Sequence, residues 1–165
     1  EAAIRLSRPG TGSVALFGTT SEKALCEQVR TAIAQAGIHA VNLAGATSLR
    51  EFIQLAAACL AFLTNDSGSM HIASALNVPT VAIFGATDHV GTGPTGDRAR
   101  IVRHHVDCSP CLLRDCPIDH RCMTAVTSER VALTALELRE RLVHQVRAGE
   151  RRVRTGPLPE GRRRR

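Results

Sequence analysis

The stretch Phe62-Leu-Thr-Asn-Asp-Ser-Gly-Ser-Met-His-Ile-Ala-Ser-Ala-Leu76 decides the fold class. Its short apolar start ends at Asn65-Asp-Ser-Gly68, and apolar residues then recur at helical spacing, which predicts a strand that turns directly into a helix. A second apolar strand, Thr80 to Phe84, follows and ends in Gly85. Strands that alternate with helices through such short turns indicate βαβ units and a parallel sheet.

The same alternation extends on both sides of this stretch. Apolar runs predict strands at 14–17, 39–42, 60–64 and 80–84, with a further one starting at Ile101. Apolar residues at helical spacing predict helices over 22–36, 48–58, 68–76 and 128–147. Because the strands are apolar throughout, they suit a sheet that is buried on both faces. We therefore predict an α/β fold: a Rossmann-like parallel sheet with helices on both faces.

The composition excludes several classes of protein. Hydrophobic residues make up 44% and charged residues 22% of the 165 residues, so long disorder is not expected over most of the chain. The apolar run from Leu55 to Leu63 is less than half of the ~20 residues that span a bilayer. With no Trp, no Tyr and four Phe, a nucleic-acid surface built on aromatic stacking is not expected. We expect a cytoplasmic protein with reduced thiols.

The positive charge is concentrated near the C-terminal end. Residues 150–165 hold seven Arg and two Glu, a charge of +5, which leaves +1 of the total of +6 for residues 1–149. A segment rich in Arg, Pro and Gly buries too little apolar surface to fold. We therefore predict a domain over 1–148 and a disordered tail over 149–165.

The turn after the third predicted strand has the features of an anion site. A helix that begins at the carboxyl edge of a parallel sheet presents unpaired backbone N–H groups, which favour a phosphate. Gly68 lets a ligand approach the backbone closely, Ser67 adds a hydroxyl donor, and His71 lies one helical turn later. Asp66 suits capping N–H groups or sugar hydroxyls better than a phosphate. The alternative, in which Asp66 and Ser67 only cap the helix, stays open.

Two other loops are expected at the same edge, where open α/β sheets bind their ligands. Gly85 closes one strand and precedes a polar loop through Asp88 and Gly96. Leu43-Ala-Gly45 follows another strand. We expect these loops to converge with the turn at Gly68.

Four cysteines form a cluster, Cys108-x2-Cys111-x4-Cys116-x5-Cys122. Four thiolates this close in sequence could hold zinc tetrahedrally or ligate an iron–sulfur cluster. Only the first spacing is usual for a metal knuckle, so free thiols or disulfides remain the alternative. Cys26 and Cys59 lie in apolar helical patterns and are expected to be small core residues.

These motifs resemble those of glycosyltransferase family 9, the ADP-heptose:lipopolysaccharide heptosyltransferases. The resemblance is carried by four segments: Thr64 to Gly85, Leu16-Phe-Gly18, Asn42-Leu-Ala-Gly45 and Cys108 to Met123. It implies the GT-B architecture, with this chain as the C-terminal donor-binding half. It also implies that Ser67, Gly68 and His71 contact the donor diphosphate and that Asp66 holds heptose hydroxyls. The remaining donor-binding residues that it implies are Asn42, Leu43, Ala44 and Gly45, around the adenosine, with Met70 and Gly85.

The resemblance further implies inverting transfer of L-glycero-D-manno-heptose from ADP-heptose to the lipopolysaccharide inner core. No cofactor is expected for this chemistry, although a structural zinc at the Cys cluster is one expectation. The catalytic base and the acceptor site belong to an N-terminal domain that this sequence lacks, so no catalytic residue is expected here. The family's location implies the cytoplasm, at the inner face of the inner membrane, with peripheral membrane contact.

This sequence also departs from the family pattern. The first strand of the donor domain is missing, together with the phosphate-contacting Lys that follows it, since Lys23 is placed in a helix. We therefore expect this chain alone to bind donor weakly and to be inactive in transfer. Two alternatives stay open: a non-catalytic nucleotide- or anion-binding module, and a metal-binding interaction protein built on the Cys cluster.

Overall fold

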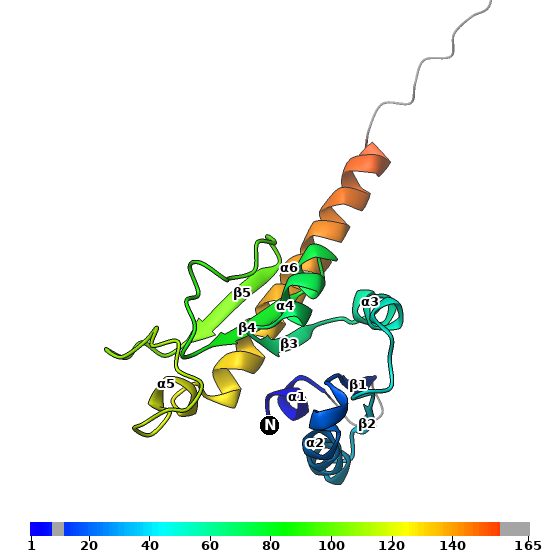
Figure 1. Ribbon diagram of the computed structural model, residues 1–165. Coiled ribbons are helices and arrows are strands. Elements are labelled where there is room, and N and C mark those ends of the chain that lie inside the picture. Colours follow the sequence, from blue (N-terminus) through cyan, green and yellow to red (C-terminus); the bar gives the residue numbers. More distant parts are fainter. Residues whose placement is uncertain (8–11, 156–165) are drawn as a thin grey trace, which may run out of the picture.

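The computed structural model describes residues 1–7 and 12–155 and has the predicted α/β class (Figure 1). Its strands are β1 (Ser13–Leu16), β2 (His39–Asn42), β3 (Phe62–Asn65), β4 (Thr80–Phe84) and β5 (Ala99–Arg103). The α-helices are α1 (Ala2–Leu6), α2 (Lys23–Gln35), α3 (Leu49–Ala57), α4 (Gly68–Ala75), α5 (Arg121–Thr124) and α6 (Ser128–Thr155), with a 3-10 turn, η1, at Thr20–Glu22.

All strand pairings in the described residues are parallel, but they form two sheets. One sheet has the order β1-β2 and the other has the order β3-β4-β5. A doubly wound sheet places its chain-first strand at the centre, in the order 3-2-1-4-5-6. Among the described strands, none pairs with the free edge of β1 or with that of β3. The orders β1-β2 and β3-β4-β5 therefore correspond to the strands on either side of the central position in such a sheet.

The larger sheet is covered by helices on both faces. Side chains alternate along β4, so that Val81 packs with Val131 and Ala135 of α6, whereas Ala82 and Phe84 pack with Met70 of α4. These side chains are all essentially inaccessible to solvent. The near-continuous apolar sequence of β4 is thus explained by burial on both faces, as predicted.

Three aromatic rings connect the two sheets. Phe17, just after β1, lies 5.1 Å from Phe52 of α3 and 6.1 Å from Phe62 of β3 between ring centroids. Phe52 and Phe62 are 6.1 Å apart and nearly perpendicular. Such aromatic pairs contribute roughly 0.5–1.5 kcal/mol beyond their buried area, and here they tie the elements of both sheets into one core.

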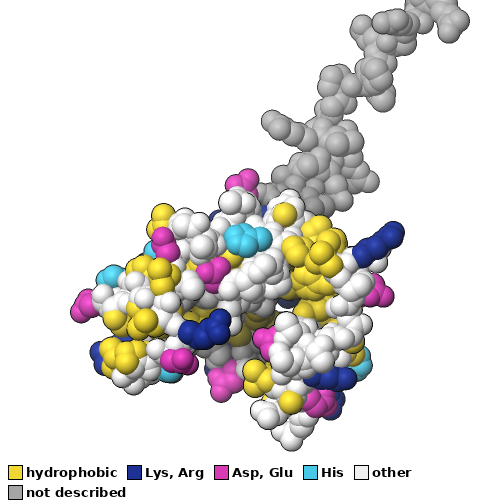
Figure 2. Space-filling model, viewed as in Figure 1, with side chains coloured by type: hydrophobic (Ala, Val, Ile, Leu, Met, Phe, Trp, Pro, Cys, Tyr) yellow, Lys and Arg dark blue, Asp and Glu magenta, His cyan; other side chains and the backbone are white. Residues whose placement is uncertain are grey.

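Helix α1 also spans the two halves. Its Ala2 and Leu6 side chains pack against the core beneath α6, while Ala3 and Ile4 pack against the core formed by α2 and β2. The remaining surface is partly apolar: Leu49 of α3 is 66% exposed, and Figure 2 shows hydrophobic side chains gathered in this part of the molecule.

Most element bounds differ from the sequence prediction by one or two residues, and two differences are larger. The last helix continues beyond 147 to Thr155, so the first part of the predicted disordered tail is helical, and residues 156–165 lie outside the described residues. Arg is a good helix former, and the Arg-rich sequence extends the periodic segment that precedes it. Helix α5, inside the Cys-rich loop, was not predicted at all. Within the described ranges no helix is both long and apolar enough to cross a membrane.

Candidate functional site

The turn between β3 and α4 carries a group of hydroxyls. The Oγ of Ser67 lies 2.7 Å from the Oγ of Ser69 and 3.1 Å from the Oγ1 of Thr64. Ser67 is the N-cap residue of α4 in an extended conformation, yet its side chain makes no capping hydrogen bond. The Ser67 hydroxyl is therefore held by neighbouring hydroxyls and does not cap the N–H groups of its own helix.

The start of α4 is open to a ligand. The first backbone N–H groups of a helix have no partner within it, and they attract anions because the helix dipole adds partial positive charge. Gly68 is exposed, and a Cβ added to it would meet no atom within 4 Å. An anion can therefore reach the backbone at Gly68 without displacing any described side chain.

Asp66 is fixed beside this turn by the loop after β4. Its Oδ2 accepts a hydrogen bond from the Oγ1 of Thr92 at 2.8 Å. The loop that carries Thr92 is itself closed by the Asp88 carboxylate, which accepts from the N–H of Val90 at 3.0 Å. The Asp66 carboxylate is thus oriented by Thr92 and keeps a free oxygen for a ligand hydroxyl.

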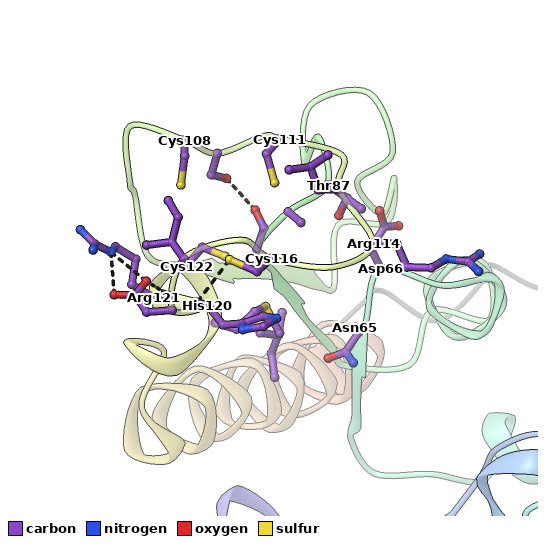
Figure 3. A pocket seen from close by; sticks show the side chains of 18 residues that line it. Asn65, Asp66, Thr87, Cys108, Cys111, Arg114, Cys116, His120, Arg121 and Cys122 are labelled. Atoms are coloured by element: carbon purple, nitrogen blue, oxygen red, sulfur yellow. Dashed lines mark hydrogen bonds and ion pairs between the residues drawn. The ribbon is translucent and has the colours of Figure 1, made fainter.

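A pocket of about 260 Å³ opens at the carboxyl ends of β3 and β4 (Figure 3). Asn65 and Asp66 line one part of it, Gly85 to Thr87 line another, and the Cys-rich loop from Cys108 to Met123 forms the rest. Arg114 lies on the loop beside Asp66 in this view. The Asp119 carboxylate pairs with the Arg121 Nε at 2.9 Å, and this hydrogen bond lowers the pKa of Asp119.

The Cys-rich loop is anchored to the end of β4 by two hydrogen bonds. The Oγ of Ser109 donates to the carbonyl of Gly85 at 2.6 Å, and the N–H of Leu112 donates to the carbonyl of Ala86 at 2.8 Å. A Cβ at Gly85 would overlap the Met123 side chain and lie 3.2 Å from the Cys122 Sγ, so a larger residue there would have to displace Met123. The loop therefore closes directly over the edge of the sheet.

Cys116 has the most distinctive environment in the loop. Backbone N–H groups of Ile118 and His120 surround its sulfur and lower the pKa of the thiol. The N–H of His120 donates to the Cys116 Sγ at 3.4 Å, and His120 adopts φ +55° to do so. This arrangement stabilises a thiolate.

The segment predicted to lie around the adenosine, residues 42–45, is fixed by hydrogen bonds within the protein. The Asn42 Nδ2 donates to the carbonyl of Lys23 and to Glu27, and its Oδ1 accepts from the N–H of Ala44. Ala44 is buried, at 1% exposure, so its side chain is not available to a ligand. The N–H of Leu43 and that of Gly45 bond to the β1 end of the small sheet, so neither is free. None of these residues lines the pocket.

Four other predicted donor contacts also lie outside the pocket: Ser67, Gly68, Met70 and His71. The Met70 side chain is fully buried between α4 and β4, which makes a direct contact with a donor unavailable and corrects that prediction. Its apolar side chain faces the sheet because position 70 falls on the inner side of α4. His71 is exposed on α4, one turn after Ser67.

The expected zinc site is not supported. Among the residues that the structure describes, no three Cys, His, Asp or Glu side chains converge closely enough to hold one metal ion. All four predicted ligands nevertheless line the same pocket, and all four thiols are free.

The sequence reasoning missed several residues at the site: Thr64, Ser69, Thr92 and Arg114. Thr64 and Ser69 flank the Asp-Ser-Gly turn as hydroxyl residues, which was a usable signal. Thr92 lies 26 positions from its partner Asp66, and Arg114 is brought to the same pocket by the loop fold. No local pattern identifies these last two.

Comparison with known proteins places these motifs in a family. A sequence model of "Glycosyltransferase family 9 (heptosyltransferase)" matches residues 3–121. The lipooligosaccharide heptosyltransferase 2 of Campylobacter jejuni serotype O:2 is 33% identical over 140 residues, which is 83% of this chain and 44% of the relative. That of Haemophilus influenzae is 45% identical over 92 residues, which is 55% of this chain and 27% of the relative.

Solved structures give the same result. The structure of E. coli ADP-heptose lipopolysaccharide heptosyltransferase II matches with a TM-score of 0.69 and 31% identity, over 85% of this chain and 40% of that one. A family 9 glycosyltransferase from Veillonella parvula has the same TM-score at 20% identity, which supports the fold alone. The chain spans less than half of the length of these relatives. Because the family match covers well over half of its residues, the chain belongs to glycosyltransferase family 9, the heptosyltransferases.

Proposed function

We propose that this chain is the donor-binding part of a glycosyltransferase that moves L-glycero-D-manno-heptose from ADP-heptose to the lipopolysaccharide inner core. Transfer is an inverting displacement whose base is supplied by another domain, at the inner face of the inner membrane. The observation that carries this proposal is the open start of α4, where exposed Gly68 and uncapped N–H groups adjoin the hydroxyls of Ser67 and Ser69.

The diphosphate of the donor fits this turn on chemical grounds. Departure of the nucleotide leaves negative charge on the diphosphate, and fixed N–H dipoles and hydroxyl donors stabilise that charge. His71 follows Ser67 by one helical turn and adds a donor on the same face. Asp66, oriented by Thr92, accepts hydrogen bonds from sugar hydroxyls, for which a carboxylate is well suited.

The loop from Asn42 to Gly45 remains the proposed neighbour of the adenosine. Its backbone and the Asn42 side chain are fixed by internal hydrogen bonds. We therefore propose that this loop contacts the adenine base through its shape alone. It provides a rigid surface for the base and offers it no free polar side chain. The identity of the carried sugar rests on the family resemblance and on the names of the relatives.

Calorimetric titration with ADP tests the diphosphate site. Ser67→Asp places a carboxylate at the proposed phosphate position and should weaken ADP binding by at least about tenfold, the effect of losing one charge-assisted hydrogen bond. His71→Ala should weaken it similarly. Ser13→Asp and His39→Ala are matched controls, because both residues lie at the amino ends of β1 and β2, in the sheet that does not contain β3. The affinity for AMP, which lacks the second phosphate, should change much less in Ser67→Asp than the affinity for ADP.

The sugar contact is tested separately. Asp66→Asn should weaken ADP-heptose binding by about tenfold and leave ADP binding unchanged, because only the sugar reaches the carboxylate in this proposal. Equal ADP affinities in the wild-type chain and in the Ser67 and His71 variants would remove the diphosphate assignment. An equal loss of ADP and ADP-heptose binding in Asp66→Asn would remove the sugar assignment.

A further inference from the structure

Two loops that wall the pocket leave the larger sheet side by side. β4 ends at Phe84 and β5 ends at Arg103, and these two residues are partners in the parallel register. The loop after β4 carries Thr87, which lines the pocket, and Thr92, which holds Asp66. The loop after β5 is the Cys-rich loop, which forms much of the remaining wall. A residue that fixes both loops therefore also fixes the shape of the site.

The side chain of Arg103 connects the two loops. Its Nη1 lies 3.2 Å from the Nε2 of His89, in the loop after β4, and its Nη2 lies 3.2 Å from the Nδ1 of His105, just after β5. A guanidinium carries N–H donors and no acceptor, so both ring nitrogens accept and both imidazoles are neutral. The planar guanidinium presents its donors in a fixed geometry. Arg103 thus holds one imidazole from each loop.

Arg103 is itself fixed to the sheet. Its side chain is half-buried, and alternation along β5 places it on the same face as Ile101, which packs against the core beneath α4. Its carbonyl accepts from the Nη1 of Arg130 in α6 at 3.1 Å. Neither of the ion pairs found among the described residues includes Arg103. Its guanidinium is therefore used to hold the imidazoles and does not pair with a described carboxylate.

A compact turn connects His89 to Thr92. The carbonyl of Asp88 accepts from the N–H of Thr92 at 2.9 Å, and the Asp88 carboxylate accepts from the N–H of Val90 at 3.0 Å. These hydrogen bonds close residues 88–92 into one turn. Fixing the imidazole of His89 therefore also fixes the backbone of Thr92.

The same turn packs tightly against β5. A Cβ added to Gly93 would overlap the carbonyl of His89 and lie 3.0 Å from the Cδ1 of Ile101. The backbone just after Thr92 therefore lies close to the strand that carries Arg103. The hydrogen bond from Arg103 to His89 and this contact together place the turn on the sheet.

The hydroxyl of Thr92 joins the turn to the candidate site. Its Oγ1 lies 2.8 Å from the Asp66 Oδ2 and 2.9 Å from the Asp88 carbonyl, so its single proton is directed between two acceptors. Thr92 is exposed, and an exposed hydroxyl orients a carboxylate only when its backbone is held in place. We propose that Arg103, acting through His89 and its turn, is a positioning residue for Asp66 and hence for the donor sugar. This role rests on the proposed function, in which Asp66 contacts the sugar.

Calorimetric titration of the whole chain with ADP and with ADP-heptose tests this role. Arg103→Met keeps an unbranched side chain and removes every N–H donor. It should weaken ADP-heptose binding by about fivefold, the effect of one lost hydrogen bond, and leave ADP binding unchanged. Arg100→Met is the matched control on the same strand, because Arg100 is exposed and donates to the carbonyls of Asp97 and Ala99. Both affinities should be unchanged in this control.

A double-mutant cycle shows whether Arg103 acts through Thr92. Thr92→Val removes the hydroxyl and should weaken ADP-heptose binding by the same factor as Arg103→Met, whereas Thr92→Ser keeps the hydroxyl and should retain the affinity. In the Thr92→Val chain, adding Arg103→Met should cause no further loss, because the hydroxyl that Arg103 positions is already absent. A merely structural role of Arg103 would give two independent losses.

Amide exchange provides a readout without any ligand. The amides of Val90 and Thr92 should exchange faster in Arg103→Met than in the wild-type chain, and at the wild-type rate in Arg100→Met. His89→Gln keeps a side-chain acceptor and should preserve slow exchange better than His89→Ala. Urea unfolding of each variant separates a loosened turn from a loss of the whole fold.

Three outcomes would overturn the role of Arg103. They are an unchanged ADP-heptose affinity in Arg103→Met, an equal loss of ADP and ADP-heptose binding, and a second full loss when Arg103→Met is added to Thr92→Val. Asp66→Asn, titrated in parallel, separates this failure from that of the proposed function. ADP-heptose binding that is sensitive to Asp66→Asn but not to Arg103→Met would leave the sugar contact intact and remove only the role of Arg103. Binding that is insensitive to Asp66→Asn would remove both.

Discussion

At the scale of single residues, Gly45 and Gly68 occupy opposite environments after two parallel strands. Gly45 has φ +67°, and a Cβ there would lie 2.8 Å from the Thr20 Cα, so the backbones of two segments touch. Gly68 begins a helix, and a Cβ there would lie in open space. Packing therefore accounts for the glycine at position 45. No packing contact accounts for the glycine at position 68, where the open space is available to a ligand.

Gly68→Ala should separate stability from binding. Alanine suits a helix better than glycine, so the thermal midpoint should stay unchanged or rise slightly, by the equivalent of about 0.4–1 kcal/mol. ADP binding should weaken by about tenfold or more, because the new methyl occupies the approach to the N–H groups. Thermal melts and calorimetry on one preparation check both. Unchanged ADP affinity would mean that the open space has no ligand.

Gly45→Ala should give the opposite pattern. The substituted residue must hold a left-handed backbone, which costs about 1–3 kcal/mol, and it must also displace the Thr20 backbone. Urea unfolding should therefore show a clear loss of stability. A variant as stable as the wild-type chain would show that the contact with Thr20 relaxes easily.

At the scale of elements, helix α3 is fixed by a reciprocal capping box. The N–H of Glu51 donates to the Ser48 Oγ at 3.4 Å, while the N–H and the hydroxyl of Ser48 donate to the Glu51 carboxylate at 2.8 and 2.7 Å. The hydrogen bond from the Ser48 side chain, followed by that from its N–H, lowers the pKa of Glu51 below its ordinary value of 4.5. This interaction is local, because Ser48 and Glu51 lie three positions apart at the start of the helix.

The capping box should make stability depend on pH in the acid range. A folded-state pKa below the unfolded value means that the contribution is fully present above pH 4.5 and is lost as pH falls through the folded value. Glu51→Gln should flatten this part of the pH profile, measured by urea unfolding. Ser48→Ala should lower stability by about 1 kcal/mol at neutral pH. In the double variant, a pH profile as steep as that of the wild-type chain would contradict the assignment.

At the scale of the whole molecule, the edge strands of the two parallel sheets include β1 and β3, whose second edges have no partner among the described residues. Neither β1 nor β3 has a described partner on its second edge, and the strand orders fit a doubly wound sheet with its central position between them. Exposed apolar side chains such as Leu49 and Leu60 add to the open surface.

Amide exchange should report these open edges. The amides of β4, which is paired on both sides, should be the most protected in the larger sheet. In β1 and β3, amides that point away from the paired neighbour should exchange much faster than those that point toward it. Uniform protection along β1 or β3 would show that a further strand, in this chain or in a second copy, covers the edge.

The sequence alone determined the local elements and the turn that carries the site. The strands at 39–42 and 80–84 have the predicted bounds, because short apolar runs with clear breakers depend little on distant contacts. The cap at Ser48, the helix after Gly68 and the family resemblance were likewise encoded locally.

Tertiary structure decided what depends on long-range placement. It buries Met70 and Ala44, although each lies in a motif that predicts a ligand site. The exposure of a side chain depends on which other residues pack against it, and the local sequence does not specify them. It brought Thr92 to Asp66 and folded the four cysteines around one pocket, because loop closure places side chains that no spacing rule relates. It also divided the strands into two sheets, because pairing depends on which partner strand is present and local propensity does not supply one.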